Sequence, residues 1–325
     1  MIILGIESTA HTLGVAILND KQVLSNVKDI HTTKKGGLIP FKLGEHHINC
    51  FDKIFLNALS KAGIKPEMIE LIAYSESPGL GNTLRIGAAF ARTLAILLDK
   101  PLIPVNHCIA HLEIGRLRTK ASDPVMLYAS GANTQVIAYE AGKYRIFGET
   151  LDMGIGNFID SFAREIGLGF PGGPLIEKLA INGEFIELPY VVKGMDVSFS
   201  GLHTKLKQLS KNNTKKNLAF SMQETVFAML VEVSERAMAH TGKNELVLGG
   251  GVACNKRLQE MCRRMCDDRN AKFFVPENEF LVDNAAMIAW TGYLMFNSSK
   301  KNSVVPELAG INPYKRTDDV IVNWR

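Results

Sequence analysis

The sequence has few cysteines and no long apolar run. It contains five cysteines in 325 residues, and this odd number favours reduced thiols in a cytoplasmic protein over a disulfide framework. The best apolar stretch, Ile86–Leu98, is interrupted by Arg92 and is far too short to span a bilayer, so we expect no membrane association. The first residues, Met1–Leu4, lack the basic segment of a targeting signal and are typical of a buried strand.

The sequence also has little excess charge of either sign. Lys+Arg number 37 and Asp+Glu 33, which gives a net charge of +4, whereas proteins that coat nucleic acid are usually far more basic. A nucleic-acid partner would therefore meet local basic patches, although such runs are more often plain solvated faces. The candidates are Arg116, Arg118, Lys120, Lys205, Lys207, Lys211, Lys215 and Lys216.

Predicted strands and helices alternate along the chain, which indicates α/β layers. The strands Ile2–Ile6 and Gly14–Leu18 are joined by a polar turn, and Val125–Tyr128 and Thr134–Tyr139 repeat this arrangement, which suggests a duplicated unit. Apolar spacing predicts a helix over residues 84–98. The remaining expected elements are strands at Leu71–Tyr74, Glu245–Leu248 and Val320–Val322 and helices from Asn255 and over Asn284–Phe296.

Turns of small residues follow three of the predicted strands, at Ser77–Gly81, Ala129–Asn133 and Gly249–Ala253. Backbone N–H groups in such turns can approach an anion closely. None of them is specific alone, because the sequence has neither a complete dinucleotide fingerprint nor a Walker lysine pattern. Together they favour a two-lobed fold that binds a nucleotide.

His107 and His111 are the most informative pair of side chains. Asn106 is a good helix N-cap, and residues four apart on the helix that follows share one face, so two imidazoles can meet one metal ion. In zinc peptidases a glutamate follows the first histidine of such a pair, but Cys108 stands there, which argues against peptidase chemistry. Asp283 is a candidate third ligand, with a plain helix N-cap as the alternative interpretation.

Several motifs, taken in order, resemble the universal tRNA threonylcarbamoyltransferase family. This family comprises the bacterial TsaD proteins and their archaeal and eukaryotic counterparts in the KEOPS complex. The resemblance covers nearly the whole chain, and the two ends of the chain are more similar to the archaeal or eukaryotic branch. The motifs are Gly5–His11, His107–Gly115, Tyr128–Gln135, Ser198–Leu202, Gly249–Ala253 and the segment around Asp283.

The resemblance implies an actin-like, sugar-kinase-like (ASKHA) fold with two α/β lobes and a nucleotide cleft between them. We expect residues 1–120 plus 296–325 in the N-terminal lobe and 121–295 in the C-terminal lobe. The implied reaction moves the threonylcarbamoyl group of threonylcarbamoyl-adenylate, made by a separate synthase, to N6 of the adenosine 3′ of the anticodon. It forms t6A in tRNAs that read ANN codons and releases AMP.

The resemblance also implies roles for residues. His107, His111 and Asp283 would hold one Fe²⁺ or Zn²⁺ ion, with Tyr128 close enough to join. No covalent nucleophile is required, because the mixed anhydride is already activated and needs only positioning and charge stabilisation. The residues that would contact the adenylate are Tyr128, Ala129, Ser130, Gly131, Ala132, Asp160, Gly173, Glu177 and Asn255, with Asp160 and Glu177 on the ribose hydroxyls.

Ala132 departs from the family, which usually has a second glycine there. If the position needs a positive φ, alanine would cost about 1 kcal/mol.

The implied partners are tRNA and KEOPS-type subunits: a small atypical kinase or ATPase, a dimerising subunit and a regulatory subunit. We expect them to dock on apolar helices of the first lobe, including Leu84–Leu98. Two other functions stay open. A small-molecule kinase of the same fold would need a catalytic aspartate near the γ-phosphate, whereas Glu7 and His11 occupy the first turn. A nucleotide-binding scaffold without activity would not need the complete set of metal ligands, His107, His111 and Asp283.

Overall fold

Two five-stranded sheets are the framework of the molecule within residues 1–33 and 38–325, which the computed structural model describes. A small hairpin of β9 (Val192–Lys193) and β10 (Asp196–Val197) lies outside them. The first sheet consists of β1 (Ile2–Glu7), β2 (Thr12–Asn19), β3 (Gln22–Ile30), β4 (Leu71–Ser77) and β5 (Leu102–Asn106). The second consists of β6 (Val125–Ala129), β7 (Thr134–Glu140), β8 (Lys143–Glu149), β11 (Glu245–Gly249) and β12 (Lys272–Phe274).

The two sheets have the same topology. The strand order is β3-β2-β1-β4-β5 in the first sheet and β8-β7-β6-β11-β12 in the second. In each, the first strand pairs antiparallel with the next strand of the chain and parallel with a later one, β1 with β4 and β6 with β11. The predicted duplication of the strand–turn–strand unit is therefore confirmed, and it extends to the whole sheet.

Helices cover the faces of the sheets, as crossovers between parallel strands require. Short 3-10 turns η1 to η5 lie at Pro66–Met68, Gly251–Cys254, Lys300–Asn302, Pro306–Leu308 and Thr317–Asp319. The helices are α1 (Pro40–Ala62), α2 (Gly81–Leu98), α3 (His107–Arg118), α4 (Ile155–Glu165), α5 (Gly173–Ala180), α6 (Ser200–Leu209), α7 (Lys215–Thr241), α8 (Lys256–Asp268), α9 (Asn278–Leu281) and α10 (Ala285–Ser298).

Apart from Glu7 at its end, the strand β1 lacks polar side chains, because both faces of the first sheet are covered. α1 and α2 pack on one face, while α10 packs on the other. Gly5 allows the close approach of α10, since a Cβ there would lie 2.3 Å from the carbonyl oxygen of Ala285. The lobe division at residues 120 and 295 stays a prediction, and we propose to count all of α10 with the first lobe.

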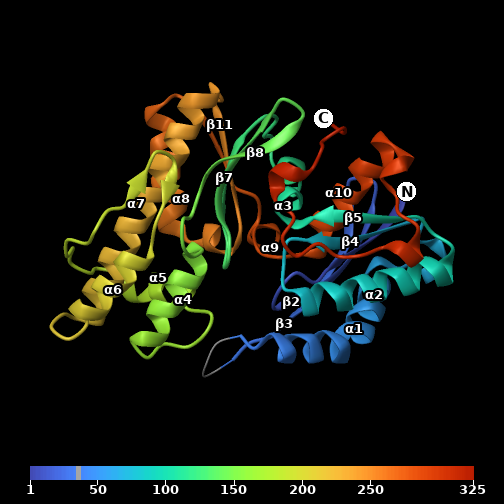
Figure 1. Cartoon of the computed structure of the whole chain (residues 1–325), viewed down its shortest axis with the longest axis horizontal. Coiled ribbons are helices and arrows are strands. Elements are labelled where there is room, and N and C mark those ends of the chain that lie inside the picture. The colour runs from blue at the N-terminus through green and yellow to red at the C-terminus, as the bar shows by residue number, and fades with distance from the viewer. Residues whose placement is uncertain (34–37) are drawn as a thin grey trace.

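Helix α3 lies between the two sheets and packs against both lobes. Ala110 and Ile114 join the core formed with α10, whereas Ile109 and Leu112 pack with Tyr128 of the second sheet. In Figure 1, α3 and α9 stand between a lobe built on β7, β8 and β11 and a lobe built on β4 and β5. Side chains at the start of α3 are therefore placed where the lobes meet.

The C-terminal segment runs along both lobes and does not form the predicted strand at Val320–Val322. Val304 makes a single bridge to Leu102 of the first sheet, and Ile321 makes a single bridge to Lys143 of the second. The prediction is wrong because, within the described residues, the backbone pairing of this segment consists only of the bridge and of the bond from Val322 N–H to the Gly142 carbonyl (3.0 Å). No helix in the described ranges has the length and apolar character needed to cross a membrane.

Candidate metal and nucleotide site

Helix α3 begins at His107 because Asn106, the last residue of β5, caps it. The Asn106 Oδ1 accepts hydrogen bonds from the N–H groups of Cys108 (3.1 Å) and Ile109 (3.2 Å), which confirms the predicted N-cap. His107 and His111 then lie one turn apart, and only 5% and 2% of their surfaces are exposed. Two buried imidazoles thus face the junction of the lobes.

The cap of α10 is Asn284, whose side chain accepts from Met287 N–H at 3.0 Å, so the alternative interpretation of Asp283 as the N-cap is wrong. Because its neighbour does the capping, the Asp283 carboxylate is free to face α3. Its Oδ1 lies 3.4 Å from Nε2 of His107 and 3.4 Å from Nε2 of His111. The Tyr128 hydroxyl lies 3.1 Å from the same His107 nitrogen.

These atoms fit a metal ion. One ligand atom from each of His107, His111 and Asp283 lies within 4.8 Å of the other two. Two ligands bound at about 2.1 Å in tetrahedral geometry are about 3.4 Å apart, which is the separation found between Asp283 and each histidine. Nitrogen and carboxylate donors suit a divalent transition metal.

Glu7 orients His107, a role that was not predicted from the sequence. Glu7 Oε2 lies 2.9 Å from Nδ1 of His107, and Glu7 Oε1 accepts from Thr9 N–H at 2.7 Å. A hydrogen bond from Nδ1–H to the carboxylate leaves the Nε2 lone pair of His107 free to bind a metal ion. The signal in the sequence was a single carboxylate that ends an apolar strand, and that side chain is completely buried.

The charges at the site favour a protonated His107, because it lies between the carboxylates of Glu7 and Asp283. Burial alone would lower the pKa of His107, but Glu7 and Asp283 raise that pKa well above its usual value. Burial lowers the pKa of His111. Burial would raise the pKa of Asp283, but the two histidines hold that pKa well below its usual value. A bound cation would replace the proton on His107.

Lys28 of β3 also reaches this site, which sequence reasoning missed. Its Nζ donates to the backbone carbonyl of Asp283 at 3.2 Å. Burial lowers the pKa of Lys28, although the Asp283 and Glu279 carboxylates act in the opposite direction. A cation from the first lobe therefore lies beside a candidate metal ligand.

The turn after β6 is held firmly and leaves two amide groups free. The carbonyls of Ser130 and Gly131 accept from Gly156 N–H (3.0 Å) and Asn157 N–H (2.8 Å) at the start of α4. The N–H groups of Gly131 and Ala132 make no hydrogen bond within the described residues, so they are available to an anion. Ala132 does not adopt a positive φ, so the expected cost of alanine at this position does not arise.

The turn after β11 packs directly on the turn after β6. Gly250 has φ of 90°, and a Cβ there would lie 2.3 Å from the Ala129 carbonyl oxygen, so only glycine fits. The Asn255 side chain caps α8 through Oδ1 and donates from Nδ2 to Gln223 Oε1 at 3.0 Å. Asn255 is thus largely occupied within the protein and keeps one amide hydrogen.

The other predicted nucleotide residues lie in two hydrogen-bonded groups. Asp160 on α4 accepts from Gly172 N–H at 2.7 Å, next to Gly173, and burial raises the pKa of Asp160. Glu177 on α5 accepts from Lys256 N–H at 2.7 Å, next to Asn255. Each bond uses one carboxylate oxygen, and the other oxygen has no hydrogen bond from any residue in the described ranges. A hollow of about 570 Å³ between α5, α7 and α8 is lined by Glu177 and Lys256, among others.

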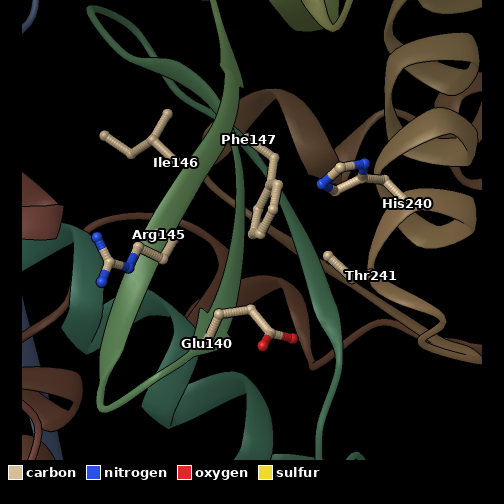
Figure 2. Close-up of a pocket in the computed structure, with 6 residues that line it drawn as sticks. All are labelled: Glu140, Arg145, Ile146, Phe147, His240 and Thr241. Carbon is tan, nitrogen blue, oxygen red and sulfur yellow. The ribbon is translucent and has the colours of Figure 1, made fainter.

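A second hollow contains none of the predicted site residues. It has a volume of about 480 Å³ and is lined by Glu140, Arg145, Ile146, Phe147, His240 and Thr241. Figure 2 shows His240, near the end of α7, extending toward Phe147 of β8, and the centres of these rings are 5.7 Å apart.

Several of the predicted basic residues are held in ion pairs. Arg116 pairs with Glu113 (2.8 Å), and Arg118 pairs with Glu277 (2.6 Å). Lys207 lies 3.5 Å from Glu165.

Comparison with known sequences agrees with these features. The family model described as TsaD, tRNA N6-adenosine threonylcarbamoyltransferase, matches residues 21–290. A protein of that name from Thermococcus kodakarensis is 54% identical over 327 residues and covers 100% of both chains. Another, from Methanococcoides burtonii, is 51% identical over 99% of this chain and 97% of its own. A probable bifunctional tRNA threonylcarbamoyladenosine biosynthesis protein from Methanosarcina acetivorans is 50% identical over 99% of this chain and 59% of its own length.

Solved structures with little sequence identity share the fold. HypF from T. kodakarensis aligns with a TM-score of 0.66 at 15% identity, over 94% of this chain and 49% of its own. The activator of 2-hydroxyisocaproyl-CoA dehydratase from Clostridium difficile, with bound ADPNP, aligns with a TM-score of 0.55 at 12% identity, over 94% and 99% of the two chains. The predicted two-lobed ASKHA-like fold is thus confirmed. Together with the family match over residues 21–290, these findings show that the chain belongs to the tRNA N6-adenosine threonylcarbamoyltransferase family.

Proposed function

We propose that this chain transfers the threonylcarbamoyl group of threonylcarbamoyl-adenylate to N6 of the adenosine 3′ of the anticodon in tRNAs that read ANN codons. A bond forms between N6 and the carbamoyl carbon, the bond from that carbon to the phosphate oxygen breaks, and AMP leaves. The proton lost from N6 passes to the released phosphate or to solvent. A separate synthase supplies the adenylate. Family membership supports the reaction class, and the arrangement of residues supports where it takes place.

One observation carries the proposal. Tyr128 is at once the fourth group beside His107, His111 and Asp283 and the first residue of the segment expected to hold the adenylate. The Tyr128 side chain at the candidate metal site and the free N–H group of Gly131 are therefore three residues apart on the same short segment of backbone. A substrate that joins a phosphate to an adjacent carbamoyl group matches this spacing.

His107, His111 and Asp283, with Tyr128 beside them, would hold one Fe²⁺ or Zn²⁺ ion, since both ions accept imidazole and carboxylate ligands. When bound, such an ion supplies Lewis acidity, which polarises an oxygen of the substrate. Glu7 keeps the Nδ1 proton of His107 directed away from the ligand position.

The remaining residues position the adenylate. The N–H groups of Gly131 and Ala132 would receive the phosphate, and the free carboxylate oxygens of Asp160 and Glu177 would accept the ribose hydroxyls. The adenine would enter the hollow beside Glu177 and Lys256. Gly173 and Asn255 directly precede Pro174 and Lys256, which line this hollow. Holding both reactants in place accounts for the rate without a covalent nucleophile.

The partners in this proposal are tRNA and KEOPS-type subunits: a small atypical kinase or ATPase, a dimerising subunit and a regulatory subunit. The end of α2 supports subunit docking there, because Ile96 and Leu97 are 52% and 74% exposed, and Leu308 beside α2 is 81% exposed. The paired arginines argue for weak tRNA binding by the chain alone. We propose that it acts in the cytoplasm, because its five cysteines are all free thiols.

A reconstitution tests the proposal. Unmodified tRNA, threonine, bicarbonate, ATP and the adenylate-forming enzyme are combined with and without this protein, and then with the companion subunits. We expect t6A only when the protein is present, and faster formation with the subunits. Absence of t6A with every component present would contradict the proposed transfer. ATP consumption with small-molecule acceptors, and none with tRNA, would instead indicate a kinase.

A further inference from the structure

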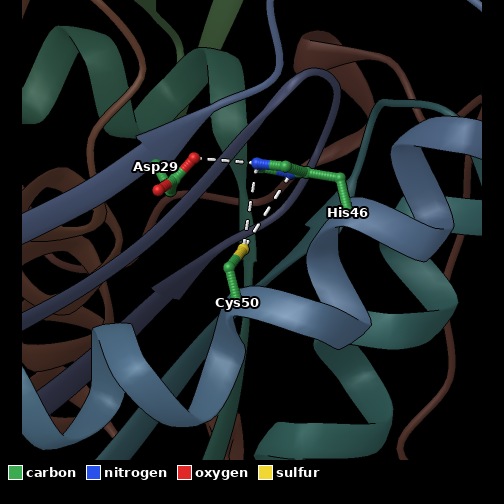
Figure 3. Close-up of side chains that lie close together, drawn as sticks. All are labelled: Asp29, His46 and Cys50. Atoms are coloured by element: carbon green, nitrogen blue, oxygen red, sulfur yellow. Dashed lines mark hydrogen bonds and ion pairs between the residues drawn. The ribbon is translucent and has the colours of Figure 1, made fainter.

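A second group of metal-binding side chains lies on the first lobe, apart from the site described above. Asp29 is near the end of β3, and His46 and Cys50 are four residues apart on α1, so the two share one face of that helix. Within the described residues, one ligand atom from each lies within 4.8 Å of the other two. Figure 3 shows Asp29 and Cys50 both facing ring nitrogens of His46.

The distances are those of a preformed ligand set. Nε2 of His46 lies 2.8 Å from Oδ1 of Asp29 and 3.9 Å from Sγ of Cys50. With Zn–N of about 2.1 Å and Zn–S of about 2.3 Å, tetrahedral ligands are about 3.6 Å apart, so small side-chain rotations admit an ion. The Asp29 side chain is 47% exposed and that of His46 16%, which gives an ion access from solvent.

Neighbouring histidines complete the surroundings. Nδ1 of His47 lies 3.2 Å from Nδ1 of His46. It can therefore accept a hydrogen bond from the Nδ1–H of His46 while Nε2 of His46 binds a cation. The far nitrogen of His47 is buried without a partner among the described residues. The centres of the His31 and His46 rings are 5.4 Å apart, so His31 is within reach as a fourth ligand.

This group is separate from the first site. Asp29 and Lys28 are consecutive on β3, so their side chains point to opposite faces of the sheet. Lys28 contacts Asp283 beside the histidines of α3, whereas Asp29 contacts α1. The two sites are thus on opposite sides of one strand.

We propose that Asp29, His46 and Cys50 form a second metal site that takes Zn²⁺ or a similar divalent ion. One carboxylate, one imidazole and one thiolate form a mixed donor set that suits an ion of borderline softness. Binding would release the thiol proton of Cys50 to solvent and tie the end of β3 to α1.

Co²⁺ titration of the full chain tests this site, because a thiolate ligand to Co²⁺ gives a charge-transfer band that imidazole and carboxylate ligands do not. We expect two ions per chain and a thiolate band in the unchanged protein. Cys50→Ser should lose one ion and the band. His107→Ala should lose the other ion and keep the band. Cys254→Ser is the matched control, since this thiol is half-buried like Cys50, and it should keep both ions.

A single bound ion without a thiolate band in the unchanged protein would overturn the second site, as would a band that survives Cys50→Ser. Should Cys50→Ser fail to fold, Asp29→Asn provides the second test, because its side chain is half exposed and of the same size. It should weaken the second ion more than tenfold, and unchanged affinity there would also refute the assignment.

Discussion

Glu7→Gln tests whether a buried carboxylate prepares His107 for a metal ion. In the unchanged protein, Glu7 Oε1 accepts from Thr9 N–H (2.7 Å) and Oε2 faces Nδ1 of His107 (2.9 Å). Glutamine has nearly the same shape but only one oxygen. If that oxygen keeps the bond to Thr9, the amide NH₂ faces His107 and makes Nδ1 an acceptor. The imidazole proton then moves to Nε2, the nitrogen that faces Asp283 and the candidate ion.

The expected size of the effect follows from this change of tautomer. Loss of a partner that orients a ligating histidine typically lowers metal affinity by about 10- to 100-fold. This corresponds to about 1.4 to 2.8 kcal/mol of binding free energy. The substitution also removes the negative charge closest to Nδ1, which acts in the same direction. Transfer activity should fall with metal occupancy and recover in part when excess metal is added.

A chelator competition titration measures the affinity, with thermal unfolding as the check on folding. Glu113→Gln is the control, because Glu113 is a carboxylate of α3 that is 1% exposed, and it bonds to Trp324 and Arg116 rather than to a candidate ligand. Its metal affinity should match that of the unchanged protein. If folded Glu7→Gln also binds metal with unchanged affinity, Glu7 does not set the tautomer of His107.

Three further outcomes are expected. His107→Ala should remove the ion of the first site and abolish transfer while the protein stays folded, and full occupancy of that site by elemental analysis would contradict the ligand assignment. Hydrogen bonds to charged groups contribute about 1.5–3 kcal/mol, so Glu177→Ala should weaken adenine-nucleotide binding about tenfold or more. Calorimetry that finds unchanged affinity in both Glu177→Ala and Asp160→Ala would exclude the ribose role. The raised pKa of His107 in the metal-free protein contributes stability that is complete below pH 6.5 and is lost as the pH rises through that raised pKa. Metal must displace the same proton, so affinity should rise by about tenfold per pH unit up to that pKa, and a flat profile in competition titrations would be inconsistent with it.

Local patterns in the sequence were sufficient for several features. The fold class followed from alternating apolar strands and helices, and the duplication from the repeated strand–turn–strand unit. The start of α3 followed from Asn106, because an N-cap is a local hydrogen bond between a side chain and the next turn. The pairing of His107 with His111 followed from helical periodicity alone. Each of these depends on residues that are close along the chain.

Other features depend on how distant segments pack. The sequence could not place Asp283, which is 172 residues from His111, because its position results from the packing of α10 against α3 and from the cap at Asn284. Glu7 became a partner of His107 only through the alignment of β1 with the start of α3 across the first sheet. Asp29 and Cys50 likewise meet because α1 folds back over β3. Periodicity determined which side chains share a face of one element, whereas tertiary packing decided which faces meet.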